Sequence, residues 1–404
     1  MNYVEYFILL KLQILTTVFL LSLTVFVSAC GDSESQTTTI ETTTSTEATN
    51  TQDVSTTESQ STDISSSPGT FTYSGIMSIE RISPAAVSLQ DGKVLIVGGR
   101  GKGLGRNPGI HASSEIYDPS TGEWSDSGEM SDVREEPTAT LLADGRVLVI
   151  GGRDTHKELS GDPDLFDPST NTWTSASKLM DPRESHGAVL LDDGKVLVVG
   201  GKNSMLKQLS SSELYNPDEN SWEEAGESIE ARINHTVTLL SDGKVLSAGG
   251  GKDDGPYLKS AEIYDPSTNT WSAVPEMSVS RALHSATLLN DGRVLVVGGK
   301  GKKTSAEIYD PGSNSWSSAG DTADPRAEHI AILLSDGRVL VAGGIGVINS
   351  SEIYDPSTNT WSAAAEMGES RYRFRAVHIS GDRILIAGGL SSNRATASSE
   401  IFTP

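Results

Sequence analysis

Seven arginines stand at corresponding positions along the chain, and they are the first candidates for chemistry. They are Arg81, Arg134, Arg183, Arg232, Arg281, Arg326 and Arg371. A guanidinium is a planar fork of donors that suits a carboxylate, a sulfate or an acidic peptide. If each arginine opens the innermost strand of a repeat, the seven would surround the mouth of one axial channel. The alternative is architectural: each arginine pairs with a repeat acid such as Glu262, or with a neighbouring carbonyl.

Two further arginines, Arg373 and Arg375, break the pattern in the last repeat and favour a functional role for that sector. Four repeats also carry a histidine three residues after the arginine. These are His186, His235, His284 and His329. A metal would need its ligands to converge to about 2.1 Å, whereas residues at matched heights of separate repeats stay apart. We therefore expect no metal, and hydrogen bonds from these rings to the next repeat.

The remaining composition narrows the function. We find no Ser-His-Asp signature, phosphate loop or zinc spacing, and most carboxylates fall in Asp-Gly and Asp-Pro turns. The formal net charge is −23, of which about −16 belongs to the residues from Phe71 onward. Nucleic acids and anionic lipid surfaces attract positive patches, so neither is an expected partner. The sequence predicts no catalytic residue and no cofactor.

A Gly-Gly doublet recurs seven times and marks the repeats whose strands must position these arginines and histidines. The first glycines are Gly98, Gly151, Gly200, Gly249, Gly298, Gly343 and Gly388, at steps of 53, 49, 49, 49, 45 and 45 residues. Each unit reads as four short strands, a to d from inside to outside. An Asp-Gly turn such as Asp242-Gly243 joins the first two, and an Asp-Pro turn such as Asp265-Pro266 joins the last two. A period near fifty built from strands and turns predicts a radial β array.

Second strands such as residues 196–199 are apolar on both faces, so they need cover on both sides, as in sheets stacked around an axis.

With the doublets, the Tyr-Asp-Pro turns and the tryptophans that follow, the chain resembles the kelch-repeat β-propellers over about 334 residues. In that family the doublet permits close approach of backbones, and the aromatic residues pack between blades. The matching pairs are Tyr117/Trp124, Phe166/Trp173, Tyr215/Trp222, Tyr264/Trp271, Tyr309/Trp316 and Tyr354/Trp361.

The repeat count predicts seven blades. The last unit stops one strand short at Pro404, while residues 71–81 align with residues 271–281 and place Phe71 at the tryptophan position. The N-terminal strand is therefore expected to supply the outermost strand of the seventh blade and to remove the exposed edges. The fold class is all-β: a seven-bladed kelch-type β-propeller with four antiparallel strands per blade, expected to be monomeric.

The b–c and d–a loops should share one face, and the tight turns the other. Variable loops carry function more often than tight turns do. The longest b–c loop, in the first blade, holds a basic patch of Arg100, Lys102, Arg106 and His111, for which the alternative is a solvated glycine-rich loop. Galactose-oxidase-type copper chemistry needs a cysteine-crosslinked tyrosine, and the propeller has no cysteine.

The chain divides into residues 1–29, 30–69 and 70–404. The first is apolar and ends before Cys30, resembling a lipoprotein signal peptide whose cysteine is lipidated; the alternative is an uncleaved signal anchor. The second is rich in Ser and Thr and is expected to be a disordered tether, or else a glycosylated stalk. Either N-terminal interpretation predicts an exported cell-envelope protein anchored to the membrane.

These observations favour a membrane-tethered, extracytoplasmic propeller. It would bind a glycan, a cell-wall polymer or a protein through its b–c/d–a loop face. The alternative is a carbohydrate-active enzyme, mutarotase- or lyase-like, that uses arginine and histidine at the channel mouth.

Overall fold

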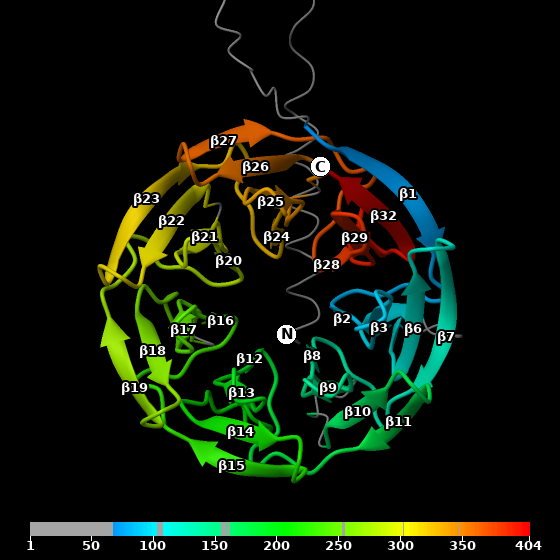
Figure 1. Cartoon of the computed structure of the whole chain (residues 1–404), viewed down its shortest axis with the longest axis horizontal. Coiled ribbons are helices and arrows are strands. Elements are labelled where there is room, and N and C mark those ends of the chain that lie inside the picture. The colour runs from blue at the N-terminus through cyan, green and yellow to red at the C-terminus, as the bar shows by residue number, and fades with distance from the viewer. Residues whose placement is uncertain are drawn as a thin grey trace, which may run out of the picture. The chain divides into compact units, whose positions relative to one another are not determined.

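The computed structural model describes residues 68–102, 108–154, 159, 162–252, 255–301, 303–346 and 348–404. They form seven four-stranded antiparallel sheets arranged radially about one axis (Figure 1). The fold is an all-β, seven-bladed β-propeller, which confirms the prediction. The signal peptide and nearly all of the tether, which are expected to precede the propeller, lie outside the described residues. No helix among the described residues is long and apolar enough to cross a membrane.

Strands a and b line the centre of the wheel. In blades one to seven, strand a is β2 (Ala85–Ser88), β8 (Thr138–Leu141), β12 (Gly187–Leu190), β16 (Thr236–Leu239), β20 (Ser285–Leu288), β24 (Ile330–Leu333) and β28 (Arg375–Ile379). Strand b is β3 (Val94–Val97), β9 (Val147–Ile150), β13 (Val196–Val199), β17 (Val245–Ala248), β21 (Val294–Val297), β25 (Val339–Ala342) and β29 (Arg383–Ala387).

Strands c and d form the outer part. Strand c is β6 (Ser113–Asp118), β10 (Asp164–Asp167), β14 (Ser212–Asn216), β18 (Ala261–Asp265), β22 (Ser305–Asp310), β26 (Ser351–Asp355) and β32 (Ser398–Thr403). Strand d is β7 (Glu123–Glu129), β11 (Thr172–Ser175), β15 (Ser221–Ala225), β19 (Thr270–Val274), β23 (Ser315–Asp321), β27 (Thr360–Ala363) and, in blade seven, β1 (Thr70–Ile76). Two small hairpins, β4 (Arg100–Lys102) with β5 (Pro108–Ile110) and β30 (Leu390–Ser391) with β31 (Arg394–Ala395), rise from the b–c loops of blades one and seven.

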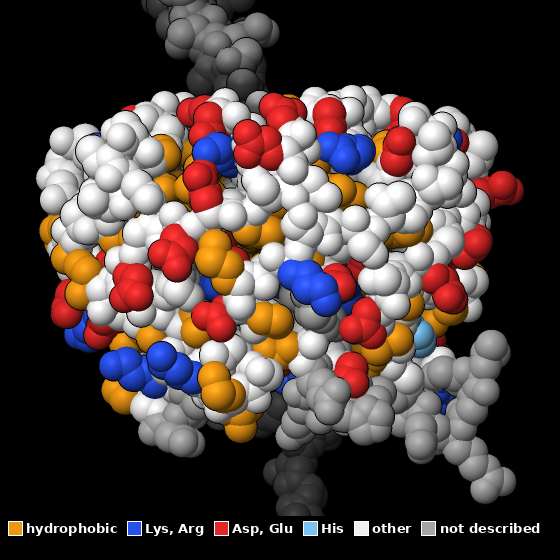
Figure 2. All heavy atoms as spheres, turned by 90° about the horizontal axis from the view of Figure 1, so that it is seen from below, with side chains coloured by type: hydrophobic (Ala, Val, Ile, Leu, Met, Phe, Trp, Pro, Cys, Tyr) orange, Lys and Arg blue, Asp and Glu red, His pale blue; other side chains and the backbone are white. Residues whose placement is uncertain are grey.

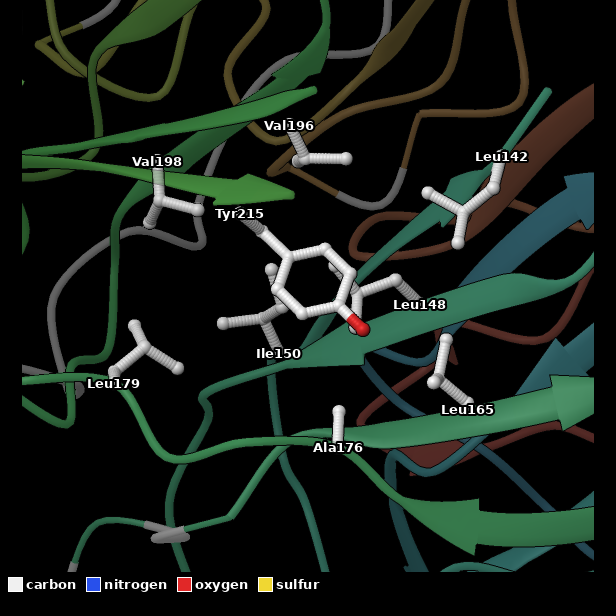
Figure 3. Close-up of a cluster of buried hydrophobic side chains, with 9 residues drawn as sticks. All are labelled: Leu142, Leu148, Ile150, Leu165, Ala176, Leu179, Val196, Val198 and Tyr215. Carbon is white, nitrogen blue, oxygen red and sulfur yellow. The ribbon is translucent and has the colours of Figure 1, made fainter. Parts of the chain in front are cut away.

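The core lies between neighbouring blades. In Figure 3, Leu148 and Ile150 of blade two face Val196 and Val198 of blade three, and the ring of Tyr215 lies among them. All are essentially inaccessible to water. Each such aliphatic side chain contributes about 1.5–3 kcal/mol through burial. This explains why the b strands are apolar on both faces.

The aromatic pairs also join blades. In all six Tyr/Phe–Trp pairs the ring centroids lie 5.0–5.2 Å apart. Five of the indole N–H groups donate to the preceding blade, as Trp222 does to the carbonyl of Ser177 at 2.8 Å. Trp124 of blade one donates to Ser399 of blade seven at 3.1 Å. The tryptophans therefore join five of the seven pairs of neighbouring blades by hydrogen bonds, including the pair at the closure.

Each glycine doublet forms the closest backbone contact between blades. The N–H of its second glycine donates to the carbonyl of the repeat arginine in the following blade, at 2.7–3.2 Å in all seven cases. The first glycine has φ between +61° and +69°. A Cβ on Gly98 would lie 2.6 Å from the carbonyl oxygen of Arg134. Only glycine fits this contact.

The N-terminal strand closes the wheel. Strand β1 pairs with β32, with Phe71 opposite Phe402 and Thr70 opposite Thr403 (Figure 1). The two phenylalanine rings lie 4.9 Å apart and take the place of a Tyr–Trp pair. Thr70 therefore lies at the face of the tight turns, and β1 runs from there toward the face of the b–c loops. Gly389 of blade seven donates to Arg81 of blade one at 2.7 Å, completing the ring.

A matched pair of glycine substitutions tests this contact. Gly98 and Gly194 both have positive φ, but a Cβ on Gly194 would meet nothing within 4 Å. We expect Gly98→Ala to lower the free energy of unfolding by about 2 kcal/mol more than Gly194→Ala, because only the former forces neighbouring blades apart. Chemical denaturation of both variants measures the difference. Equal losses would show that the doublet is not a close contact.

Candidate functional site

The seven repeat arginines lie in the interior rather than at the channel mouth. Their relative exposure is 0–1%, and each pairs with a carboxylate on strand c of its own blade. The pairs are Arg81–Glu115, Arg134–Asp164, Arg183–Glu213, Arg232–Glu262, Arg281–Glu307, Arg326–Glu352 and Arg371–Glu400. Strand a sits innermost, as expected, but these side chains turn back into the blade. The architectural interpretation is therefore the one that the geometry supports, and we leave the seven out of the candidate site.

Arg232 shows what the pairing does. Its Nη1 donates to the carbonyl oxygens of Gly249 and Ser260, both at 2.8 Å, and its Nη2 lies 2.6 Å from Glu262. The second oxygen of that carboxylate accepts the N–H of Ile229 at 2.6 Å. One buried ion pair thus joins strand a, the doublet, strand c and the preceding d–a connection. The N–H donors of Arg232 are occupied by these contacts.

The residue two positions after each repeat arginine forms the rim of the channel. These residues are Ser83, Glu136, Ser185, Asn234, Leu283, Glu328 and Arg373, and all have φ between +52° and +60°. Six backbone hydrogen bonds of 2.9–3.1 Å link the N–H of one to the carbonyl of its neighbour in the preceding blade. Left-handed backbone is uncommon outside glycine. The rim therefore holds its backbone fixed while its side chains vary.

The rim encloses a cavity of about 750 Å³ at the axis, to which both b–c and d–a loops contribute. The residue after the glycine doublet lines it in six blades. These residues are Arg100, Arg153, Lys202, Lys300, Ile345 and Leu390. Our sequence prediction included Arg100 only as part of a loop patch and missed the others. Their regular place after the doublet, basic in four repeats, was the available signal.

Most cations at the mouth lie close to a carboxylate. Two buried carboxylates lie behind them: Glu135 is 3.2 Å from Arg100 and 3.4 Å from Arg153, and Glu184 is 3.2 Å from Lys202. Lys300 is exposed and forms no ion pair with any described residue. Six cations line the cavity: Arg100, Arg153, Lys202, Lys300, Arg373 and Arg375. Four carboxylates lie on or behind its wall: Glu135, Glu136, Glu184 and Glu328. Among the described residues the mouth therefore has a surplus of two positive charges. The face seen in Figure 2 carries scattered acidic side chains and a smaller number of basic ones.

Blade seven contributes both extra arginines to this cavity, where the sequence placed them. The Nε of Arg373 donates to Glu328 at 2.8 Å, and its Nη1 lies 3.5 Å from Glu136. The hydrogen bond to Glu328 raises the pKa of Arg373 above its ordinary value. Arg375 begins strand β28 and lies below the rim. Among the residues that the structure describes, the one hydrogen bond that it donates runs from Nη1 to the carbonyl of Phe374, at 3.1 Å.

The blade-one loop patch is only partly assembled. Arg100 and Lys102 line a second cavity of about 690 Å³ between the β4–β5 and β30–β31 hairpins, together with Arg394. His111 does not join them, because it is 92% buried beneath the loop. Arg106 lies outside the described residues.

The four repeat histidines line the channel without meeting at one point. His186, His284 and His329 hydrogen-bond Thr138, Thr236 and Ser285 at 2.8–3.0 Å. These hydroxyls belong to the preceding blade, not the next one as predicted, because strand a of the preceding blade begins beside the ring. His235 lacks such a bond, since Gly187 occupies the equivalent position. The described residues contain no group of His, Cys, Asp or Glu that could hold a metal ion.

Comparison with known families identifies the repeat. The model of the KLHDC2/KLHL20/DRC7 kelch-repeats domain matches residues 83–299 and again residues 225–389. The chain belongs to the kelch-repeat family. Membership supports a binding or interaction propeller in general terms. No curated protein matches this kelch chain.

A solved structure shows the same fold. A fungal alcohol oxidase of the AA5 family, solved in complex with copper, superposes with a TM-score of 0.67 at 18% identity. The match covers 83% of this chain and 76% of that protein. At this identity the likeness concerns the fold alone.

The channel histidines predict a particular pH dependence of stability. Burial, followed by the nearby arginines, lowers the pKa of His186, His235, His284 and His329 to about 3. Unfolding restores a pKa near 6.5, so between these values the unfolded state binds more protons. Each ring then contributes a fall in the free energy of unfolding of about 1.4 kcal/mol per pH unit as the pH drops from about 6.5 toward 3.

Denaturation between pH 4 and 8 measures this slope. We expect His235→Gln to reduce it by about one proton's worth, while His378→Gln, whose ring is exposed in the folded state, leaves it unchanged. An identical slope in wild type and His235→Gln would contradict the assignment.

Proposed function

We propose that this kelch propeller is a non-catalytic binding module for an anionic glycan, cell-wall polymer or protein, which it recognises at the axial mouth. The observation that carries the proposal is the concentration of cations there. Six basic side chains line one cavity of a propeller whose formal charge is about −16. The surplus of two positive charges at the mouth means that the rest of the propeller is more negative still.

The geometry of the mouth supports binding of an extended anionic partner. The cavity is open to solvent on the loop face, and its basic residues come from blades one, two, three, five and seven. Lys300 is exposed and Arg100 is partly exposed, so both can reach a ligand without first leaving the interior. A fixed backbone rim lets such contacts form without reordering the loops, which favours affinity.

The alternative, a carbohydrate-active enzyme that uses channel arginine and histidine, has no observation among the described residues that favours it. The histidines have a pKa of about 3 and are neutral near pH 7. General acid–base catalysis favours groups whose pKa lies near the working pH. Turnover on a sugar panel that disappears in His284→Ala, with the fold intact, would support the enzyme instead.

Charge reversal at the mouth tests the binding proposal. We expect Lys300→Glu to weaken retention on an anionic polymer by about tenfold at low salt, because it places a repelling charge at an exposed contact. Lys93→Glu is the control, since Lys93 is a partly exposed lysine on the tight-turn face, where it lies 3.6 Å from Asp118. Biolayer interferometry with polyuronate, teichoic-type polyphosphate and acidic-peptide surfaces at several salt concentrations provides the measurement.

Binding through the mouth should also weaken as salt rises, because exposed charges are screened over about 10 Å at 0.1 M salt. Retention that is unaffected by Lys300→Glu, or equally weakened by Lys93→Glu, would contradict the proposal. So would the absence of retention on every surface.

We extend the proposal to location: an exported cell-envelope protein, tethered to a membrane through lipidated Cys30. Its support is the sequence alone, namely an apolar segment that ends in Ser28-Ala29-Cys30 and a Ser/Thr-rich segment that follows. We expect Cys30→Ser to abolish incorporation of labelled palmitate and to change processing, as seen by gel mobility. Unchanged gel mobility of Cys30→Ser, together with membrane retention and no label in the wild type, would favour the uncleaved signal anchor.

A further inference from the structure

Arg375 is unusual among the residues that begin strand a. At the equivalent position the other six blades carry small or uncharged residues, namely Ala85, Thr138, Gly187, Thr236, Ser285 and Ile330. In blade seven alone a long cationic side chain enters the channel, below the rim. It thus departs from the repeat at a position that faces the axis.

The guanidinium of Arg375 is poorly satisfied. One donor reaches the carbonyl of Phe374, and no carboxylate among the described residues forms an ion pair with it. Its nearest acids, Glu136 and Glu328, influence it electrostatically but are both engaged by Arg373. Burial also lowers the pKa of Arg375. A guanidinium has five N–H donors. Because Arg375 is only partly buried, its donors without a protein partner face the cavity.

The space beside Arg375 is suited to a small ligand. A cavity of about 280 Å³ lies between blades five, six and seven. Its polar lining consists of His284, Ser285, Glu328, His329, Arg373 and Arg375, and the carboxylate of Glu328 is paired with Arg373. It shares all but Ser285 of these residues with the larger cavity above, so the two are continuous and open to the mouth. At about 30 Å³ per water, it has room for roughly nine waters, or for a small oxyanion with a few waters.

A second polar group in the same channel lacks a partner. His235 is 91% buried, and neither ring nitrogen has a hydrogen-bond partner among the described residues. The three other channel histidines each bond a hydroxyl, as described above. Both nitrogens of His235 are themselves inaccessible to solvent, so this ring is not a contact for a ligand in the channel.

We propose that Arg375 holds a small free oxyanion, such as inorganic phosphate or sulfate, inside the axial channel beneath the mouth. The guanidinium fork presents two parallel N–H groups to two oxygens of the ion. Neutral histidines and the Ser285 hydroxyl line the other side. The carboxylate of Glu328 also lines the cavity, where Arg373 pairs with it at 2.8 Å. The site lies beneath the mouth and shares Arg373 and Arg375 with its lining, whereas Lys300 belongs to the mouth alone.

Calorimetric titration tests the site. Residues 65–404 form one compact unit, so this segment in Tris chloride at constant ionic strength is titrated with phosphate, sulfate and acetate. We expect phosphate or sulfate to bind at one site per chain. Arg375→Met should weaken this binding by about tenfold or more, and Arg375→Lys by less, because lysine keeps the charge but loses the fork.

Arg383→Met is the matched control. Arg383 belongs to the same blade, also donates to a single backbone carbonyl, and lies at the tight turn rather than in the channel. Thermal unfolding in chloride verifies that each variant folds. In phosphate or sulfate the wild type and Arg383→Met should gain an additional rise in Tm that Arg375→Met lacks, beyond the general effect of these salts on all variants.

The proposal is overturned if neither ion binds, or if Arg375→Met binds them as the wild type does. It is also overturned if Arg375→Met loses only polymer retention at the mouth, which would assign Arg375 to the mouth ligand. Ion binding that depends on Arg375 while Lys300→Glu leaves it intact supports it. Failure of polymer binding in every variant would bear on the proposed function alone.

Discussion

The structure depends on one contact: the carbonyl of each repeat arginine meets the glycine doublet of the preceding blade. The same arginine sends its side chain back to the doublet carbonyl and a strand-c carboxylate of its own blade. One residue type therefore organises both the interior of a blade and the boundary to its neighbour. Breaking such a buried pair leaves an uncompensated charge, which costs about 3–5 kcal/mol. This explains why the pair is repeated seven times with one change, Asp164 for glutamate.

Because these interactions fix the backbone, the positions just beyond them are free to vary. The residue two places after the arginine and the residue after the doublet both face the axis, and neither contributes a side chain to the ion pair. Their identities range from leucine to arginine. We therefore propose function at positions where the repeats differ, such as Lys300, Arg373 and Arg375, rather than where they agree.

The repeat period predicted the fold, the blade count and the closure by β1, because each follows from matching residues to a template. The same periodicity could not tell an arginine that faces the channel from one that turns into the blade. That distinction depends on χ angles and on the height of Glu262 and its counterparts, which strand order does not reveal. The sequence predicted that the histidines hydrogen-bond a neighbouring blade, but not that this is the preceding blade. His235 is exceptional only because Gly187, 48 residues earlier, lacks a hydroxyl.

The course of β1 has a consequence for how the wheel is displayed. The strand starts beside Thr403, and Pro404 follows on that same side. Both ends of the propeller therefore lie at the face of the tight turns. A linkage at either end, whether to a bilayer, a fusion partner or a solid support, leaves the opposite opening unobstructed. In a propeller linked in this way the tight turns would face the attachment, and the b–c loops would face away from it.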